Sequence, residues 1–239
     1  MQYDVYRFLR PLFFTLPPER AHQFALSSLQ AAHRWRLLSC SFDNEAAGCE
    51  FMGLRFANRI GLAAGFDKNG RYIDALGSLG FGFIEVGTVT PRPQSGQPVP
   101  RLFRLPAQRA LINRMGFPNQ GADAVAVRLR QRTYPGVLGI NIGKNATTPI
   151  ESAVDDYIAC FRTLAPCADY VVVNVSSPNT QGLRQLQSVD NLKPILSSLK
   201  EEGQRLRIRD GRRIPLLLRS PGRSVVGWRC GGWPTSGRW

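Results

Sequence analysis

Five polar side chains follow one short apolar run, and their types suit the binding and deprotonation of a small heterocycle. The run at 171–173 is entirely Val, which is typical of a strand buried on both faces of a parallel sheet. Polar residues after it lie at the carboxyl end of the strand, where barrels and doubly wound α/β proteins place their active sites. An Asx or Ser turn that satisfies its own backbone is the alternative, and both interpretations stay open. The five residues are Asn174, Ser176, Ser177, Asn179 and Thr180.

Other predicted strand ends carry residues of a similar kind. Small residues at 63–65 would let the backbone approach a flat ligand, and Lys68 suits a negatively charged group. Asn recurs at positions 113, 141, 174 and 179, more often than cores tolerate unless a ligand pairs with the amides. Because Asn offers a donor and an acceptor, such a site suits a planar heterocycle with imide edges.

Several common chemistries are poorly supported. The sequence has no GxGxxG and no GxxxxGK[ST] motif, and its strand ends carry neither His nor paired carboxylates. These absences argue against nucleotide hydrolysis, glycoside hydrolysis and a Ser-His-Asp triad. Proton abstraction then falls to Ser177 or to a water that it holds. A serine base is weak unless proton loss is coupled to another step, such as hydride withdrawal by a redox cofactor.

Alternating strands and helices must position these residues. Strands are predicted at 59–64, 81–86, 137–142, from 170, and at 214–219, with helices over 70–79, 119–132, 151–164 and 190–203. A Pro-rich excursion occupies 88–118. Repeated βα units of this spacing predict a parallel sheet, either open or closed into a barrel.

The first 40 residues differ from the rest of the chain. An aromatic and aliphatic patch at 6–16 is interrupted by Pro17 and Pro18, and an amphipathic helix is predicted over 19–38, with Ala21, Phe24 and Leu29 on one side. These two helices either cap the main domain or lie on a membrane surface. No apolar run of 18 residues occurs, so no transmembrane span and no signal peptide are predicted.

The composition narrows the choice of partners. The net charge of +14 comes without a run of five basic residues and without aromatic-basic interleaving, so nucleic-acid binding is not expected. The five cysteines form no CxxC pair, which predicts a reducing compartment and no structural metal. After Asp210 the chain holds no acidic residue, and three of its four Trp residues fall in this segment. We interpret it as a flexible basic tail or, preferably, as an out-of-frame terminus.

Five motifs together resemble the class 2, quinone-dependent and membrane-associated dihydroorotate dehydrogenases. They are GLAAGFDKNG at 61–70, EVGTVTPRPQSGQPVPRLFRL at 85–105, INRMGF at 112–117, GINIGKN at 139–145 and NVSSPNT at 174–180. The resemblance implies a (β/α)8 TIM barrel of the α/β class with an N-terminal helical extension. It also implies an FMN cofactor, oxidation of dihydroorotate to orotate in pyrimidine biosynthesis, and electron transfer to ubiquinone. Such an enzyme would be peripheral on the cytoplasmic face of the bacterial inner membrane.

The resemblance also assigns roles to single residues. Ser177 matches the catalytic base, where class 1 enzymes have a cysteine. His22 and Arg104 match positions that line the quinone tunnel, although His22 is equally interpretable as a plain helix-face histidine. The flavin contacts would be Ala64, Gly65, Phe66, Asp67, Lys68, Thr88, Asn141 and Asn174. The substrate contacts would be Lys68, Asn113, Arg114, Met115, Gly116, Phe117, Asn174 and Asn179.

The chain departs from the family in three places. Arg59 and Pro118 are small departures. At the position of Arg219 the family has a lysine that touches the flavin. The resemblance ends at this residue, and a frameshift near codon 219 would explain why. We therefore expect a 1–40 helical membrane and quinone-access segment, a 41–218 partial barrel of about five βα units, and a 219–239 basic tail. A catalytically inactive, truncated remnant of the enzyme is the alternative function.

Overall fold

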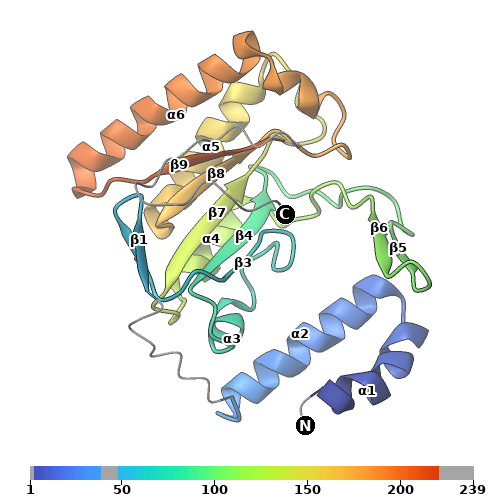
Figure 1. Cartoon of the computed structure of the whole chain (residues 1–239). Helices are drawn as coiled ribbons and strands as arrows, with labels where there is room; N and C mark the ends of the chain where they lie inside the picture. Colours follow the sequence, from blue (N-terminus) through green and yellow to red (C-terminus); the bar gives the residue numbers. More distant parts are fainter. Residues whose placement is uncertain (1–2, 39–47, 221–239) are drawn as a thin grey trace, which may run out of the picture.

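A parallel sheet of five strands forms the centre of the molecule, in the order β3-β4-β7-β8-β9 (Figure 1). The computed structural model describes residues 3–38 and 48–220. Neighbouring strands of the sheet all pair in parallel. The five predicted strands are thus confirmed, as is the α/β class. Their bounds are β3 Gly61–Leu62, β4 Phe83–Val89, β7 Val137–Ile142, β8 Tyr170–Asn174 and β9 Leu216–Arg219.

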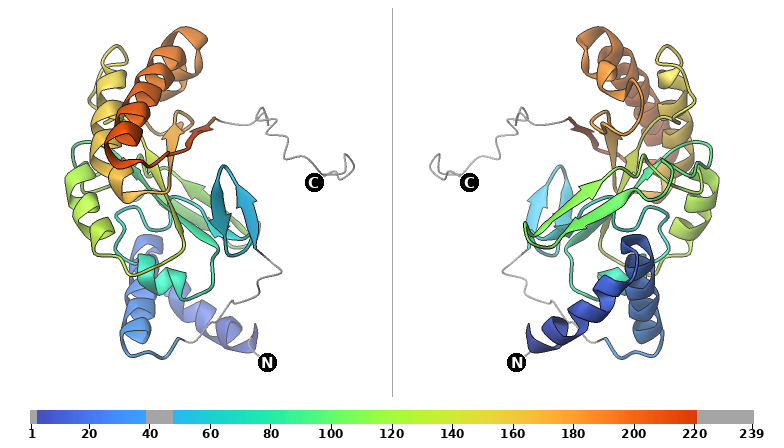
Figure 2. Two further views of the ribbon diagram at one scale, coloured as in Figure 1. Left: turned by 90° about the vertical axis from the view of Figure 1, so that its left-hand side faces the viewer. Right: turned by 90° about the vertical axis from the view of Figure 1, so that its right-hand side faces the viewer.

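Helices follow the strands and cover one face of the sheet, as both views in Figure 2 show. The side chains on this face, including Ile84, Ile140 and Val173, are fully buried against them. Burying each such side chain contributes about 1.5–3 kcal/mol, so this layer is the main core. The helices are α3 Ile73–Gly77, α4 Ala122–Arg130, α5 Ala153–Leu164 and α6 Val189–Asp210, with 3-10 turns at Ala165–Cys167 and Leu183–Gln187.

The opposite face of the sheet is apolar at one end and polar at the other. A hairpin of β1 (Cys49–Phe51) and β2 (Leu54–Phe56) packs Phe56 against Val137, Tyr170 and Val172, near the amino ends of the strands. Side chains alternate between the faces of a strand. Glu85 therefore lies on this face level with Tyr170, and Asn141 and Asn174 lie on it progressively nearer the carboxyl ends. This alternation is what places polar groups at the predicted site.

A glycine makes room for the largest side chain on this face. A Cβ on Gly139 would lie 2.0 Å from the Tyr170 ring. Because Gly139 has no Cβ, the Tyr170 ring fits beside it, and the Tyr170 hydroxyl donates a hydrogen bond of 3.4 Å to the Glu85 carboxylate.

Two helices and a further hairpin lie beyond the carboxyl end of the sheet. Helix α1 spans Tyr3–Thr15 and α2 spans Pro18–Arg34. Ala21 and Leu26 of α2 are buried, and Leu26 joins the main core beside Ile73. Phe24, which we predicted on the same side as Ala21, is 57% exposed and packs instead on Phe13 of α1. One face of α2 thus caps the main domain, as one of our two interpretations expected.

The excursion at 88–118 contains structure that the sequence analysis did not predict. Strands β5 (Leu102–Leu105) and β6 (Ala110–Asn113) form an antiparallel hairpin that reaches α2 (Figure 1). Of the predicted helices, α6 extends past 203 to Asp210. Within residues 3–38 and 48–220, no helix is long and apolar enough to cross a membrane. The segment from 221 onward, where most of the predicted tail falls, lies outside the described residues.

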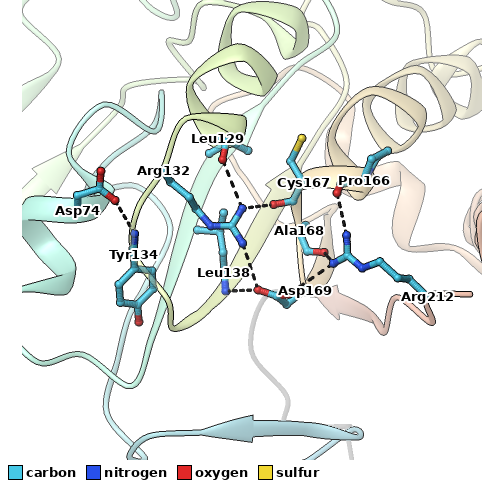
Figure 3. A network of polar contacts seen from close by, with 10 residues as sticks. All are labelled: Asp74, Leu129, Arg132, Tyr134, Leu138, Pro166, Cys167, Ala168, Asp169 and Arg212. Atoms are coloured by element: carbon cyan, nitrogen blue, oxygen red, sulfur yellow. Dashed lines mark hydrogen bonds and ion pairs between the residues drawn. The ribbon is translucent and has the colours of Figure 1, made fainter. Parts of the chain in front are cut away.

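Asp169 connects three segments at the amino end of the sheet (Figure 3). Its carboxylate accepts a hydrogen bond of 2.8 Å from the backbone N–H of Leu138. Arg132 and Arg212 form ion pairs with it at 3.6 and 3.5 Å. The two arginines also donate to the carbonyl oxygens of Cys167 and Ala168. A single carboxylate thus joins β7, the end of α4 and the chain leading into β9.

We expect Asp169→Ala to lower the free energy of unfolding by about 1–3 kcal/mol, because it leaves a backbone donor and two partly buried cations without their acceptor. The side chain is only 26% exposed. Chemical denaturation followed by circular dichroism measures the change. Glu201→Ala, which removes an exposed carboxylate from α6, is the control. Equal shifts in the two variants would contradict the role of Asp169.

Candidate active site

The loop after β3 is held against the end of β4. The Asp67 carboxylate accepts hydrogen bonds from the backbone N–H groups of Asn69, Arg71 and Tyr72, at 3.3, 3.1 and 2.7 Å. The N–H of Gly65 donates to Gly87 at 2.8 Å. Gly65 has φ +107°, and a Cβ there would meet no atom within 4 Å. The small residues at 63–65 are therefore held in place, and Gly65 faces open space.

Four buried or half-buried side chains form a continuous polar layer: Glu85, Thr88, Asn141 and Asn174. Asn141 donates to Glu85 at 2.8 Å. The Oδ1 atom of Asn141 accepts hydrogen bonds from Thr88 at 2.6 Å and from Asn174 at 3.1 Å. Burial raises the pKa of the Glu85 carboxyl, and the hydrogen bond from Asn141 opposes this shift. The structure thus joins three of the predicted flavin contacts, Thr88, Asn141 and Asn174, and bonds Asn141 to an acid that we did not predict.

The cluster at 174–180 is both a local turn and part of the candidate site. Oδ1 of Asn174 accepts from the backbone N–H and the hydroxyl of Ser176, at 3.1 and 3.0 Å. The Ser177 hydroxyl accepts from the N–H of Asn179 at 3.2 Å. These are the Asx and Ser turns that we considered as the alternative. Asn179 also donates to the carbonyl oxygen of Asn113 at 3.2 Å, which brings the turn to the end of the β5–β6 hairpin.

A cavity of about 920 Å³ lies between α2, the 63–69 loop and the β5–β6 hairpin. It brings together residues that we predicted for three different roles, and Asp67, Lys68 and Asn113 are among them. The others are Ala64, Gly65, Phe66, Met115, His22 and Arg104. Residues from far apart in the chain therefore share one hollow at the carboxyl end of the sheet.

Three basic side chains in this cavity have unusual surroundings. Lys68 donates to the carbonyl oxygen of Gly65 at 2.6 Å, and burial lowers the pKa of its ammonium group, although nearby Glu19 opposes the shift. Burial also lowers the pKa of His22. The His22 ring lies edge-on to Phe66, and its Nε2 atom is 2.9 Å from the Phe66 carbonyl oxygen. Arg104 donates to Leu16 at 2.8 Å and lies over the Phe14 ring.

An ion pair that we did not predict holds α2 to the hairpin. Arg101 donates to both carboxylate oxygens of Glu19, at 2.8 and 2.9 Å, and this bond lowers the pKa of Glu19. Arg101 also donates to the carbonyl oxygen of Gln97, whose side chain in turn donates to Asn179. The partners are 82 residues apart, so no local signal in the sequence could have paired them.

Some predicted residues lie outside the cavity. The Arg114 side chain is exposed. The carbonyl oxygens of Gly116 and Phe117 accept hydrogen bonds from Gln94. Lys144, at the end of β7, is fully buried and donates to Asn145 and Thr148, so it supports its own loop. Thr88, Asn141, Asn174, Ser177 and Asn179 do not line the cavity either, although Asn179 bonds to Asn113, which does.

The chain matches known proteins in sequence and in fold. A family model described as dihydroorotate dehydrogenase matches residues 47–219. The chain is 52% identical over 216 residues to dihydroorotate dehydrogenase (quinone) of Cellvibrio japonicus and 54% identical to that of Chromobacterium violaceum, covering 90% of this chain in each case. The crystal structure of DHODH in complex with ferulenol from Eimeria tenella superimposes with a TM-score of 0.77, at 37% identity over 85% of this chain.

The likeness covers part of each relative. The chain spans 63% of the length of both bacterial proteins and 59% of the Eimeria chain. Within that part, the parallel sheet and its helices have the fold of a TIM-barrel-type α/β protein. A match over residues 47–219, supported by identities above 50%, leaves no ambiguity about descent: the chain belongs to the dihydroorotate dehydrogenase family.

Proposed function

We propose that this chain binds FMN and dihydroorotate and that it serves the oxidation of dihydroorotate to orotate with ubiquinone as the electron acceptor. The observation that carries the proposal is the meeting of Lys68 and Asn113 in one cavity, with the Ser177–Asn179 turn bonded to Asn113. A cation and several carboxamides match the carboxylate and the imide edges of a dihydropyrimidine.

The residues present fit a flavin. A flat ring needs a wall without projecting side chains, and Gly65 faces open space beside two alanines. The Thr180 hydroxyl is buried and lacks a hydrogen-bond partner among the described residues, as expected where a ligand or water completes the site. Enzymes of this family are flavin-dependent in general. Ala64, Gly65, Lys68, Asn141 and Asn174 would hold FMN, which supplies the hydride acceptor when bound.

Ser177 would take the proton from the substrate ring. Its hydroxyl accepts a hydrogen bond from the N–H of Asn179, which would stabilise negative charge on the oxygen as the hydroxyl's own proton passes to water and the substrate proton takes its place. Lys68 would attract the substrate carboxylate. Asn113 and Asn179 would orient the imide edge, because the bond between them fixes the spacing of their two loops.

The N-terminal helices would lie on a membrane and admit the quinone. Tyr6, Phe8, Leu12 and Phe24 are exposed on α1 and α2, and an amphipathic helix of this type can lie in the interface plane of a bilayer. His22 and Arg104 line the cavity on this side. We propose a peripheral position on the cytoplasmic face of the bacterial inner membrane.

Ser177→Ala should lower the rate of orotate formation by about 10²–10⁴-fold, the usual contribution of a positioned base. Flavin content, read from the visible absorbance of the purified protein, should stay unchanged. The matched control is Ser176→Ala, the neighbouring hydroxyl that faces Asn174, which should retain most of the activity. If Ser177→Ala is as active as Ser176→Ala, Ser177 is not the base. If the unmodified chain binds no FMN, the proposed function itself is wrong.

As the pH is raised, the KM for dihydroorotate should begin to rise at a lower pH than it would if Lys68 titrated like an exposed lysine. Because burial lowers the pKa of Lys68, its positive charge is lost at a lower pH than that of an exposed lysine, as the pH rises through the lowered value. Steady-state kinetics from neutral to alkaline pH measure the effect. Lys68→Arg, which stays protonated throughout, should show no such rise, and a rise of equal size in this variant would contradict the assignment.

Arg104→Gln should raise the KM for a ubiquinone analogue by about 10–100-fold, because it removes a charge-assisted hydrogen bond to Leu16 and a stacking contact with Phe14. Reduction of a water-soluble dye with dihydroorotate should be unaffected. Arg109→Gln, an exposed change in the turn of the same hairpin, is the control. Parallel losses with quinone and dye would show that Arg104 supports the fold and not the quinone site.

A further inference from the structure

A second cavity, of about 760 Å³, lies between the end of α2, the start of α3 and the end of α4. Its walls are rich in guanidinium groups from separate parts of the chain. Arg34 and Arg36 come from the end of α2, Arg71 from the loop before α3, and Arg128 from α4. It neighbours the candidate active site, since Arg71 and Tyr72 line both cavities.

The acidic groups near these arginines are already occupied. Asp74, the carboxylate in the cavity wall, accepts a hydrogen bond of 2.8 Å from the N–H of Tyr134 (Figure 3) and one of 2.9 Å from the N–H of Thr133. Arg132 is turned toward Asp169 and Cys167. Among residues 3–38 and 48–220, the ion pairs include none of Arg34, Arg36, Arg71 and Arg128. Arg128 does donate hydrogen bonds to the carbonyl oxygen of Asn69 and to the side chain of Gln120.

The positive charges in the cavity also repel one another. Burial together with the nearby Arg71 cation lowers the pKa of Arg128. A hollow with several guanidinium groups and one occupied carboxylate favours a ligand that is small, multiply charged and rich in oxygen acceptors. Phosphate meets these conditions, because the planar donors of arginine match its oxygens in pairs.

The residues beside the cavity indicate the source of the phosphate. Trp35 and Leu37, which alternate in sequence with Arg34 and Arg36, are 77% and 69% exposed. Exposed Trp beside arginine is typical of the level of lipid headgroups, where the ring enters the interface and the cation meets phosphate. The cavity also lies at the end of α2, whose Phe24 we assign to the membrane contact.

We propose that this cavity binds the phosphate headgroup of an anionic phospholipid, and the proposal rests on the membrane-surface position given above for α1 and α2. Headgroup binding here would hold the end of α2 at the bilayer while the apolar side chains of α1 enter it. Burial of apolar side chains alone would attach α1 and α2 to any bilayer. The cavity would add a preference for anionic lipids.

Sedimentation with vesicles tests the proposal on the full chain. Binding to pure phosphatidylcholine is compared with binding to phosphatidylcholine containing phosphatidylglycerol, for the unmodified protein and for R34Q/R36Q/R71Q. The triple variant should lose affinity for the anionic vesicles on the order of 100-fold, since each surface cation contributes about a factor of five. Its binding to phosphatidylcholine should stay the same. The control R184Q/R207Q/R213Q removes three exposed arginines on or near α6 and the 183–187 turn, and it should keep the anionic preference.

The possible outcomes separate this proposal from the proposed function. If the unmodified chain sediments with neither type of vesicle, the membrane position of α1 and α2 is wrong. If it binds both types equally, only the headgroup site is wrong. Equal losses in the two triple variants would assign the preference to overall charge and overturn the site. In a last test, inorganic phosphate is added at constant ionic strength. If it removes the difference in anionic-vesicle binding between the unmodified protein and R34Q/R36Q/R71Q, the cavity binds free phosphate and the lipid proposal is overturned.

Discussion

The hydrogen bond from Asn141 to Glu85 orients the polar layer on which the candidate site depends. A carboxylate only accepts hydrogen bonds, so Glu85 requires the amide nitrogen of Asn141 to face it. The amide oxygen then points the other way and receives Thr88 and Asn174. A buried acid is costly unless donors surround it, and Asn141 and Tyr170 supply them. The orientation of the Asn141 amide, and with it the bonding of the polar layer, therefore depends on this acid.

The parts of the fold that could be predicted are those with a strong local pattern. The strands at 137–142 and 170–174 are recognisable because buried parallel strands are nearly continuous in apolar residues. The β1–β2 hairpin has strands of three residues each, too short to show alternation. The β5–β6 hairpin was not predicted because prolines are frequent in the segment around it, and proline argues against a strand. In both hairpins, tertiary packing and not β-strand propensity sets where the strands begin and end.

The site was predictable where residue type alone gives the chemistry and was missed where partners are distant. Ser177 and the carboxamides follow strands and stand out by their polarity. Glu85 sits between Ile84 and Val86, so it resembles the solvent-facing position of an ordinary strand. Only the folded sheet shows that Asn141 of β7 and Tyr170 of β8 bond to this side chain. Glu19 and Arg101 likewise have no pattern that relates them before the chain is folded.

The order of the strands in the sheet also bears on how the chain acquires its structure during synthesis. Because β3, β4, β7, β8 and β9 are neighbours in the same sequence in which they are translated, every pairing joins a new strand to one already made. No strand must wait for a distant partner, and the entropy of loop closure stays modest at each step. The sheet can therefore grow strand by strand as the nascent chain leaves the ribosome, with each helix covering the newest addition before the next strand arrives.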